Sequence, residues 1–70
     1  MKRQLVTSSN ISSIGYDTAS SALEVEFKGG AIYQYYNVPE NLYSGLINAS
    51  SIGNYMNTKI KNTHRYKQIK

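Results

Sequence analysis

The residue types best suited to binding chemistry in this sequence lie around positions 50 to 57, ahead of a basic C-terminal end. Ser50 or Ser51 can cap a helix that begins near Ile52, and the free N–H groups of such a helix start attract anions. Gly53 would let a phosphate, or another backbone, approach closely. The same residues also fit a second interpretation, in which the serine is only a cap and the glycine only permits close helix packing.

The residues that follow could add stacking and charge to such a site. Tyrosine and asparagine side chains offer a ring face and hydrogen bonds, and lysines and arginine offer charge. Basic residues mixed with aromatic ones suit single-stranded nucleic acid or nucleotides, whose bases stack and whose phosphates pair with cations. The alternative is a solvated basic tail. The candidate ligand-binding residues after the helix start are Tyr55, Asn57, Lys59, Lys61, Arg65, Tyr66 and Lys67.

The sequence carries little that could support catalysis. His64 is the only histidine and has no acidic residue near it in the chain, whereas nucleophilic catalysis needs a base held by a third group. Glu24 and Glu26 alternate onto one face of a strand, a pattern typical of a solvated sheet face. No phosphate loop, dinucleotide motif or metal signature is present. We therefore expect a protein that is not an enzyme and that uses no cofactor and no metal.

Size and charge limit the alternatives further. Seventy residues make one domain, and the formal net charge is +4. Five of the eight basic residues lie in the last twelve positions, whereas all four acids lie in the first forty. Such a basic end attracts anions, including nucleic acid. A small chain without cysteines cannot use disulfides, so a homo-oligomer is the expected aid to stability, although a compact monomer of this length can also be stable.

No apolar stretch of about 18 residues is present, and the charged N-terminus lacks a following apolar segment. We therefore expect no membrane span and a cytoplasmic location.

The elements that must position these residues follow from hydrophobic periodicity. In the second strand, Leu23, Val25 and Phe27 alternate with charged residues, and Gly29-Gly30 after it favours a hairpin. In the third, Tyr33 and Tyr35 share one face, while Tyr36 lies with Gln34 on the face expected to meet solvent. The sequence therefore predicts a three-stranded antiparallel meander, with strands over about 10–16, 22–28 and 31–38. Residues 1–7 are expected to be an N-terminal extension.

Two helices are expected after the meander. Pro39 suits a first turn, and apolar residues recur at helical spacing over 40–49. The second helix has Ile52, Tyr55, Met56 and Ile60 on one face. Tyr66 and Ile69 then either form a short C-terminal strand or dock on the core, within a basic end over 59–70. The predicted fold is α+β, a single domain over 1–70 in which two helices cover one face of a small sheet.

A set of spaced residues and motifs runs along most of the chain: Ser9, Ile11, Gly15-Tyr16, Leu23-Glu24-Val25-Glu26-Phe27, Gly30, Tyr33-Gln34-Tyr35, Val38-Pro39, Tyr43, Ala49, Ser51, Gly53 and Tyr55-Met56-Asn57. This set resembles the KTSC domain, a family named after the C-terminal region of some lysyl-tRNA synthetases and also found as short standalone proteins. The resemblance covers about residues 8 to 69. Position 56 departs from it, because Met56 stands where the family usually has phenylalanine, and methionine keeps the apolar volume roughly. The link to a tRNA synthetase implies an RNA ligand by analogy.

Three hypotheses follow. The first is a non-enzymatic binding module for a phosphate-bearing ligand, with RNA as the first choice. The second is a homo-oligomer that sequesters a small nucleotide signal molecule between its chains. The third is a protein-interaction adaptor that uses the tyrosine-rich sheet face.

Overall fold

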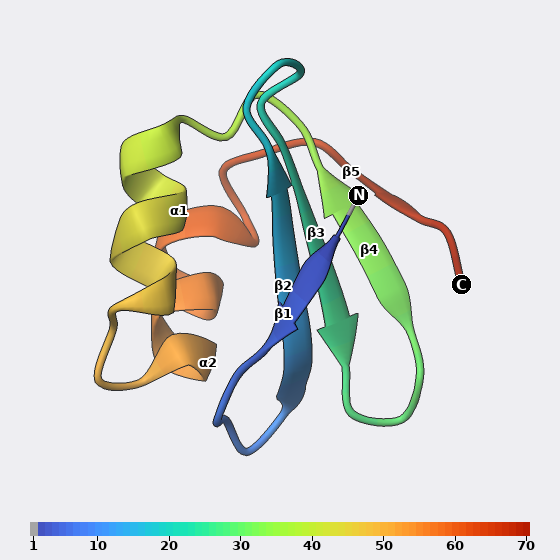
Figure 1. The fold of residues 1–70 in the computed structure, drawn as a ribbon, viewed down its shortest axis with the longest axis vertical. Coiled ribbons are helices and arrows are strands. Elements are labelled where there is room, and N and C mark those ends of the chain that lie inside the picture. The colour runs from blue at the N-terminus through green and yellow to red at the C-terminus, as the bar shows by residue number, and fades with distance from the viewer. Residues whose placement is uncertain (1) are drawn as a thin grey trace.

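The computed structural model describes residues 2–70 and shows an antiparallel sheet with helices on one side. The sheet has five strands in the order β1-β2-β3-β4-β5, so each strand pairs with its neighbour in the sequence (Figure 1). The helices are inserted between the fourth and fifth strands. The strands are β1 (Arg3–Leu5), β2 (Ile11–Asp17), β3 (Ala22–Phe27), β4 (Ile32–Tyr35) and β5 (Tyr66–Gln68).

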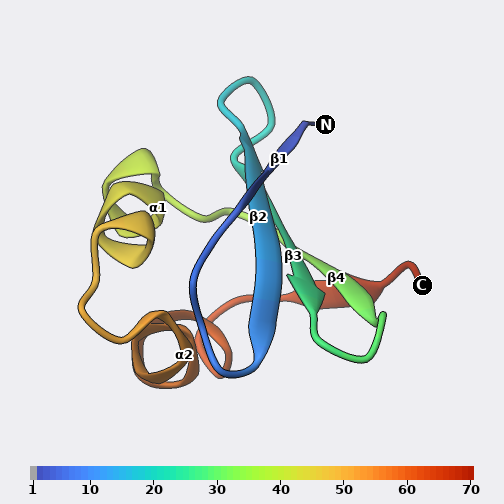
Figure 2. The ribbon, with the colours of Figure 1, turned by 60° about the horizontal axis from the view of Figure 1, so that its bottom comes forward.

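The helices are α1 (Glu40–Ile47) and α2 (Ile52–Tyr55), and α2 continues directly into a π-helix, η1 (Met56–Ile60). Figure 2 shows them stacked along one side of the sheet. The expected α+β fold with two helices on one face is therefore confirmed. Within residues 2–70, no helix has the length and apolar character needed to cross a bilayer.

The core lies between the helices and the neighbouring sheet face. It joins Ile11 and Ile14 of β2 to Leu23 and Val25 of β3, with Leu46, Ile52, Met56 and Ile60 from the helical side. Met56 is 1% exposed, so it fills the position expected of a core residue. A register shift between Ile11 and Ser13 accounts for two isoleucines three positions apart that are both buried. Such a bulge changes which residues face inward along a strand.

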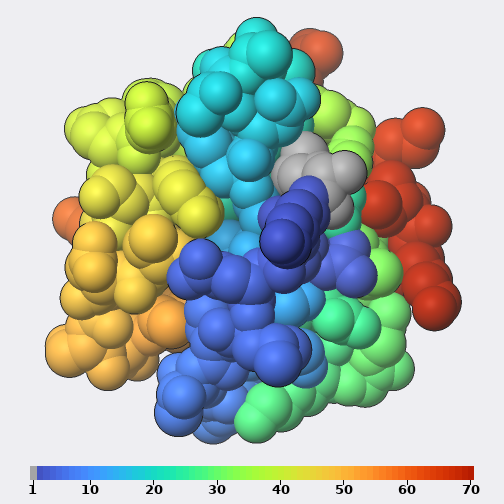
Figure 3. Space-filling view, in the orientation of Figure 1, coloured from blue at the N-terminus to red at the C-terminus, as the bar shows by residue number. Residues whose placement is uncertain are grey.

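The predicted three-stranded meander has fewer strands than the observed sheet. Residues 3–5, assigned to an N-terminal extension, form the edge strand β1, which pairs with β2. Gly15 makes this approach possible, because a Cβ there would lie 2.8 Å from the backbone oxygen of Lys2. At the other edge, Tyr66–Gln68 pair with β4, so a short C-terminal strand is confirmed. The space-filling view shows the N-terminal residues across the front of the molecule (Figure 3).

The expectation of a fully solvated face for Glu24 and Glu26 was also wrong. Glu24 is only 6% exposed, because Arg3 of β1 lies over it and forms an ion pair with it. The side-chain amide of Gln34 donates a second hydrogen bond to the Glu24 carboxylate at 2.9 Å. Burial raises the pKa of Glu24, but hydrogen bonds from Gln34 and Arg3 outweigh it and hold the pKa below the ordinary value of 4.5. Glu24 is therefore an ionised structural residue.

The second helix departs from regular α-helical geometry. Its last five residues form a π-helix, in which the Lys61 N–H donates to the carbonyl of Met56 at 2.8 Å. A π-turn is wider than an α-turn, so it changes which side chains face the sheet, and such segments are frequent at functional sites. Met56 and Ile60 are both buried here, and Lys61 follows at the end of the turn. Hydrophobic spacing alone predicts a helix at this place without showing the change.

Candidate functional site

The helix start around Ser51 has a clear structural explanation. Ser51 is the N-cap of α2, and its hydroxyl accepts a hydrogen bond from the Asn54 N–H at 3.4 Å, whereas Ser50 is exposed just before it. Gly53 makes room for a neighbouring side chain, because a Cβ there would lie 2.6 Å from the side-chain oxygen of the exposed Asn10. The close approach that glycine permits is therefore already used by a side chain of this protein.

Tyr55 and Asn57, the next two candidates, lie in different environments. Tyr55 is half-buried and packs with the core, and its hydroxyl lies so close to Gly45 of α1 that a Cβ there would overlap it. Asn57 is exposed on η1 and is not among the residues that line the pocket described below. The structure thus gives Tyr55 a helix-packing role and leaves Asn57 on the surface.

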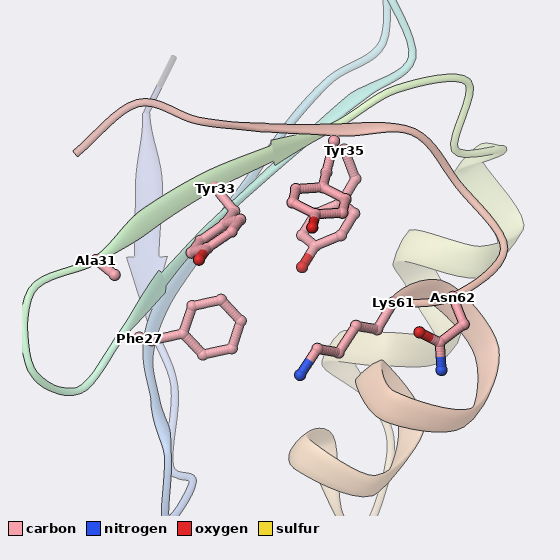
Figure 4. A pocket seen from close by; sticks show the side chains of 7 residues that line it. Phe27, Ala31, Tyr33, Tyr35, Lys61 and Asn62 are labelled. Carbon is pink, nitrogen blue, oxygen red and sulfur yellow. The ribbon is translucent and has the colours of Figure 1, made fainter.

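A pocket lies at the other end of the same helical segment. It has a volume of about 320 Å³ and is open between the β4–β5 half of the sheet and the residues that follow η1. Figure 4 shows Lys61 reaching from the end of the helix toward the rings that hang from the sheet. The lining residues are Phe27, Ala31, Tyr33, Tyr35, Lys61, Asn62 and Tyr66.

Aromatic rings form most of this pocket. The ring centroids of Tyr33 and Tyr66 are 5.5 Å apart, and those of Tyr35 and Tyr66 are 5.6 Å apart. Phe27 meets Tyr33 edge-on at 5.6 Å. The strand register explains the cluster, because Tyr66 of β5 stands opposite Tyr35 of β4, and directly paired residues share a sheet face. The aromatic cluster therefore depends on β5 returning to the sheet after the helices.

The electrostatics of the pocket favour an anion. Lys61 is the only charged residue in its lining, and no carboxylate faces it. Burial, with smaller contributions from Tyr33 and Tyr66, raises the pKa of Tyr35 to about 12, so this phenol remains a protonated hydrogen-bond donor at neutral pH. Rings, a cation and neutral donors together suit a ligand that combines a flat ring with a negative group.

The remaining basic candidates do not converge on the pocket. Lys59 is exposed on η1, and Arg65 is exposed just before β5, where its carbonyl accepts a hydrogen bond from the Tyr36 N–H at 2.8 Å. Lys67 pairs with Gln34, so it lies on the sheet face opposite the tyrosine cluster. Of the predicted ligand-binding residues, the structure brings together only Lys61 and Tyr66. Ser50, Ser51 and Gly53 lie at the far end of the same helical segment.

Sequence reasoning missed the larger part of the pocket. Tyr33 and Tyr35 were assigned to a shared strand face, which is correct, but not to a site. Phe27 and Asn62 were not considered as ligand contacts, although both line the cavity. The available signal was the run of alternating aromatic residues on β4 combined with Tyr66. Its meaning depended on whether residue 66 paired with β4, which remained open until the fold was known.

These features define a small α+β domain with a five-stranded meander and an aromatic pocket beside the last strand. The family model of the KTSC domain matches residues 7–66, and the chain belongs to this family. A crystal structure of a KTSC domain protein from Yersinia pestis superposes with a TM-score of 0.93 at 38% identity. That match covers 99% of this chain and 97% of the other.

Curated relatives show two contexts for such a domain. An uncharacterised protein from Stutzerimonas stutzeri is 43% identical over 70 residues, covering 99% of both chains. A lysine–tRNA ligase from Nostoc punctiforme is 33% identical over 59 residues, and the match covers 84% of this chain but 10% of the ligase. The same kind of domain therefore occurs alone and as a small part of a larger protein.

Proposed function

We propose that this protein is a non-enzymatic binding module for single-stranded RNA, which it contacts at the pocket lined by Tyr33, Tyr35, Tyr66 and Lys61. The observation that carries the proposal is the composition of that pocket, in which four aromatic rings and one lysine meet without any acidic residue. The proposed site therefore lies at the opposite end of the helical segment from the helix start, which the sequence indicated first.

Aromatic stacking is the first contribution to the proposed binding. Bases stack on exposed aromatic side chains with a gain of about 1–3 kcal/mol per base, and this gain requires no particular base. Tyr66 is 57% exposed, which is unusual for so large an apolar surface and leaves one ring accessible to a base. Tyr33 and Phe27 are half-buried beside it, so they extend the platform toward the sheet.

Charge is the second contribution. The net charge of +4 and the exposed basic residues of the C-terminal end attract a polyanion to this side of the molecule. Lys61 is the residue placed to pair with a phosphate next to a stacked base. The choice of RNA among phosphate-bearing ligands rests on the lysine–tRNA ligases that contain a similar region.

The proposal is for binding without reaction. The pocket lining has no carboxylate and no histidine that could act as an acid–base pair. His64 contacts Thr63 Oγ1 at 2.8 Å and the Ile60 carbonyl at 3.4 Å, and it has no carboxylate partner among residues 2–70. These contacts of His64 are local ones at the end of the helical segment.

The test is fluorescence anisotropy of a labelled single-stranded RNA across a salt series. Affinity should fall as salt rises, because bound phosphates release counterions. Lys61→Ala should weaken binding more than Lys59→Ala, although both changes remove one exposed positive charge from positions only two residues apart. Equal losses from the two variants would indicate general attraction to a basic surface and contradict the pocket. No binding at low salt would end the proposal.

Two competing functions predict different outcomes. A protein-interaction adaptor should bind its partner in a salt-insensitive manner and retain binding after loss of the basic end. A homo-oligomer that sequesters a small nucleotide should elute as a larger species in size-exclusion chromatography, and it should be stabilised thermally by a nucleotide but not by RNA.

A further inference from the structure

We infer that the pocket takes one nucleotide unit at a time, with the base inserted so that its edge accepts a hydrogen bond from the Tyr35 hydroxyl while its phosphate remains at the mouth beside Lys61. This inference rests on the proposed function, because both use the same cavity. It adds three points to the proposed function: the unit that binds, the orientation of that unit, and the residue that hydrogen-bonds to the base edge.

The Tyr35 hydroxyl is the group in the pocket best placed to contact a ligand. Tyr35 is 2% exposed, yet its hydroxyl takes part in no hydrogen bond within residues 2–70. Buried polar atoms in this protein otherwise have partners, since none of the fully enclosed side-chain nitrogen or oxygen atoms lacks one in the described part of the chain. The Tyr35 hydroxyl is therefore not sealed in the core but reaches the cavity that its residue lines. A donor that reaches the cavity is available to an acceptor on a ligand.

The chemistry of the pocket lining favours entry of the base end of a nucleotide. The inner wall consists of rings from β3, β4 and β5, which favours a flat base over a hydrated phosphate. The single cation, Lys61, is exposed and extends from the end of the helix, across the cavity from the sheet (Figure 4). A nucleotide whose base lies against the rings and whose phosphate lies beside Lys61 thus matches both the aromatic wall and the cation. Tyr35 would then meet a ring nitrogen or carbonyl oxygen on the base edge.

The size of the cavity fits a single nucleotide unit. A volume of about 320 Å³ lies at the lower end of the range for small-molecule pockets, roughly 300–1,000 Å³. Such a cavity holds one base with part of its sugar, not a stacked series. The protein should therefore bind a free mononucleotide at the same place where it holds one residue of RNA.

The experiment uses the full chain and four probes: adenosine 5′-monophosphate, adenosine, ribose 5-phosphate and inorganic phosphate. Two-dimensional NMR titration should show the monophosphate shifting amide signals of β4, β5 and Lys61, with at least tenfold weaker binding of the three partial probes. Tyr35→Phe removes only the hydroxyl and should weaken monophosphate binding about five- to tenfold. Tyr43→Phe is the matched control, because Tyr43 is half-buried against Tyr16 and lines no part of the pocket.

Each outcome has one meaning. RNA binding without any monophosphate shifts in the pocket would overturn the single-nucleotide inference and leave the RNA proposal standing. Monophosphate binding that ribose 5-phosphate equals would overturn base insertion, and this comparison needs no variant. Equal affinities of Tyr35→Phe and the wild type, with Tyr35→Phe shown to be folded by its thermal transition, would remove the role of the hydroxyl. Monophosphate binding in the absence of RNA binding would support the inference and reject RNA as the ligand.

Discussion

The helix-side face of the sheet has two halves, one covered by the helices and the other open. Over β2 and β3, the helices close the face, and Ile14, Leu23 and Val25 are completely buried. Over β4 and β5, the face remains open, and its rings line a pocket with Lys61 at the edge. One half holds the domain together, and the other exposes aromatic surface at a cost in hydrophobic burial.

The difference arises from the path of the chain. The helices leave β4, cross over the first half of the sheet and return to β5 only after η1, so their end faces the second half without covering it (Figures 1 and 2). Tyr35 belongs to both halves, because its ring packs in the core and its residue lines the pocket. Phe27 and Tyr33 also pack against the core and line the pocket, so stability and binding are best separated by mutation at the exposed residues Lys61 and Tyr66.

The largest expected effect is a cavity in the closed half. Leu46 of α1 is fully buried, so Leu46→Ala should lower the free energy of unfolding by about 2–5 kcal/mol. Tyr66→Ala in the open half should change it by about 1 kcal/mol or less, because that ring is 57% exposed. Urea denaturation of both variants measures the contrast. Equal destabilisation would show that the two halves contribute alike to stability.

The next effect is overpacking between the helices. Gly45→Ala would place a methyl group against the Tyr55 hydroxyl, and such insertions into packed contacts cost about 1–3 kcal/mol. The double variant with Tyr55→Phe should recover part of the loss, because removal of the hydroxyl makes room. Thermal unfolding of the single and double variants provides the measurement. A stable single variant would place Tyr55 away from α1 and return it to the list of free ligand contacts.

A smaller effect is expected from pH on the polar face behind the sheet. Because the pKa of Glu24 is lowered in the folded state, its contribution is complete above about 4.5 and is lost as pH falls through the folded pKa. Glu24→Gln should cost about 1 kcal/mol at neutral pH and should flatten the loss of stability in acid. Chemical denaturation between pH 7 and pH 3 tests both effects. An unchanged acid slope would mean that other carboxylates dominate.

The smallest effect is expected at the helix start. Ser51→Ala should cost about 0.5 kcal/mol, at the low end for caps, because the hydrogen bond to Asn54 is long at 3.4 Å. RNA affinity should not change, since this cap is at the far end of the segment from Lys61. Ser50→Ala is the control and should affect neither quantity. A marked loss of RNA affinity in Ser51→Ala alone would restore the helix start as the anion site.

The sequence was sufficient for most of the fold. Alternating residues such as Leu23 and Val25 and the helical spacing of Ile52, Met56 and Ile60 are local patterns, and the structure follows them. The strand β1 was missed because Arg3 and Gln4 show no apolar alternation. Its place depends instead on Gly15 and on the distant carboxylate of Glu24.

The site was harder to predict for the same reason. Ser51 and Gly53 are close together in the chain and form a recognisable motif, yet the structure makes Ser51 a helix cap and places Gly53 against a neighbouring side chain. The pocket residues come from β3, β4, the end of η1 and β5, and no local pattern connects them. Lys61 and Tyr66 were identified by composition alone. Their partners Tyr33 and Tyr35 required the β4–β5 register.

The most direct test of this account is a map of RNA contacts by two-dimensional NMR titration with a short single-stranded RNA. The account predicts that the shifted signals cluster on Tyr33, Tyr35, Lys61, Asn62 and Tyr66, with those of residues 50–54 unchanged. Shifts confined to residues 50–54, with the pocket silent, would contradict it.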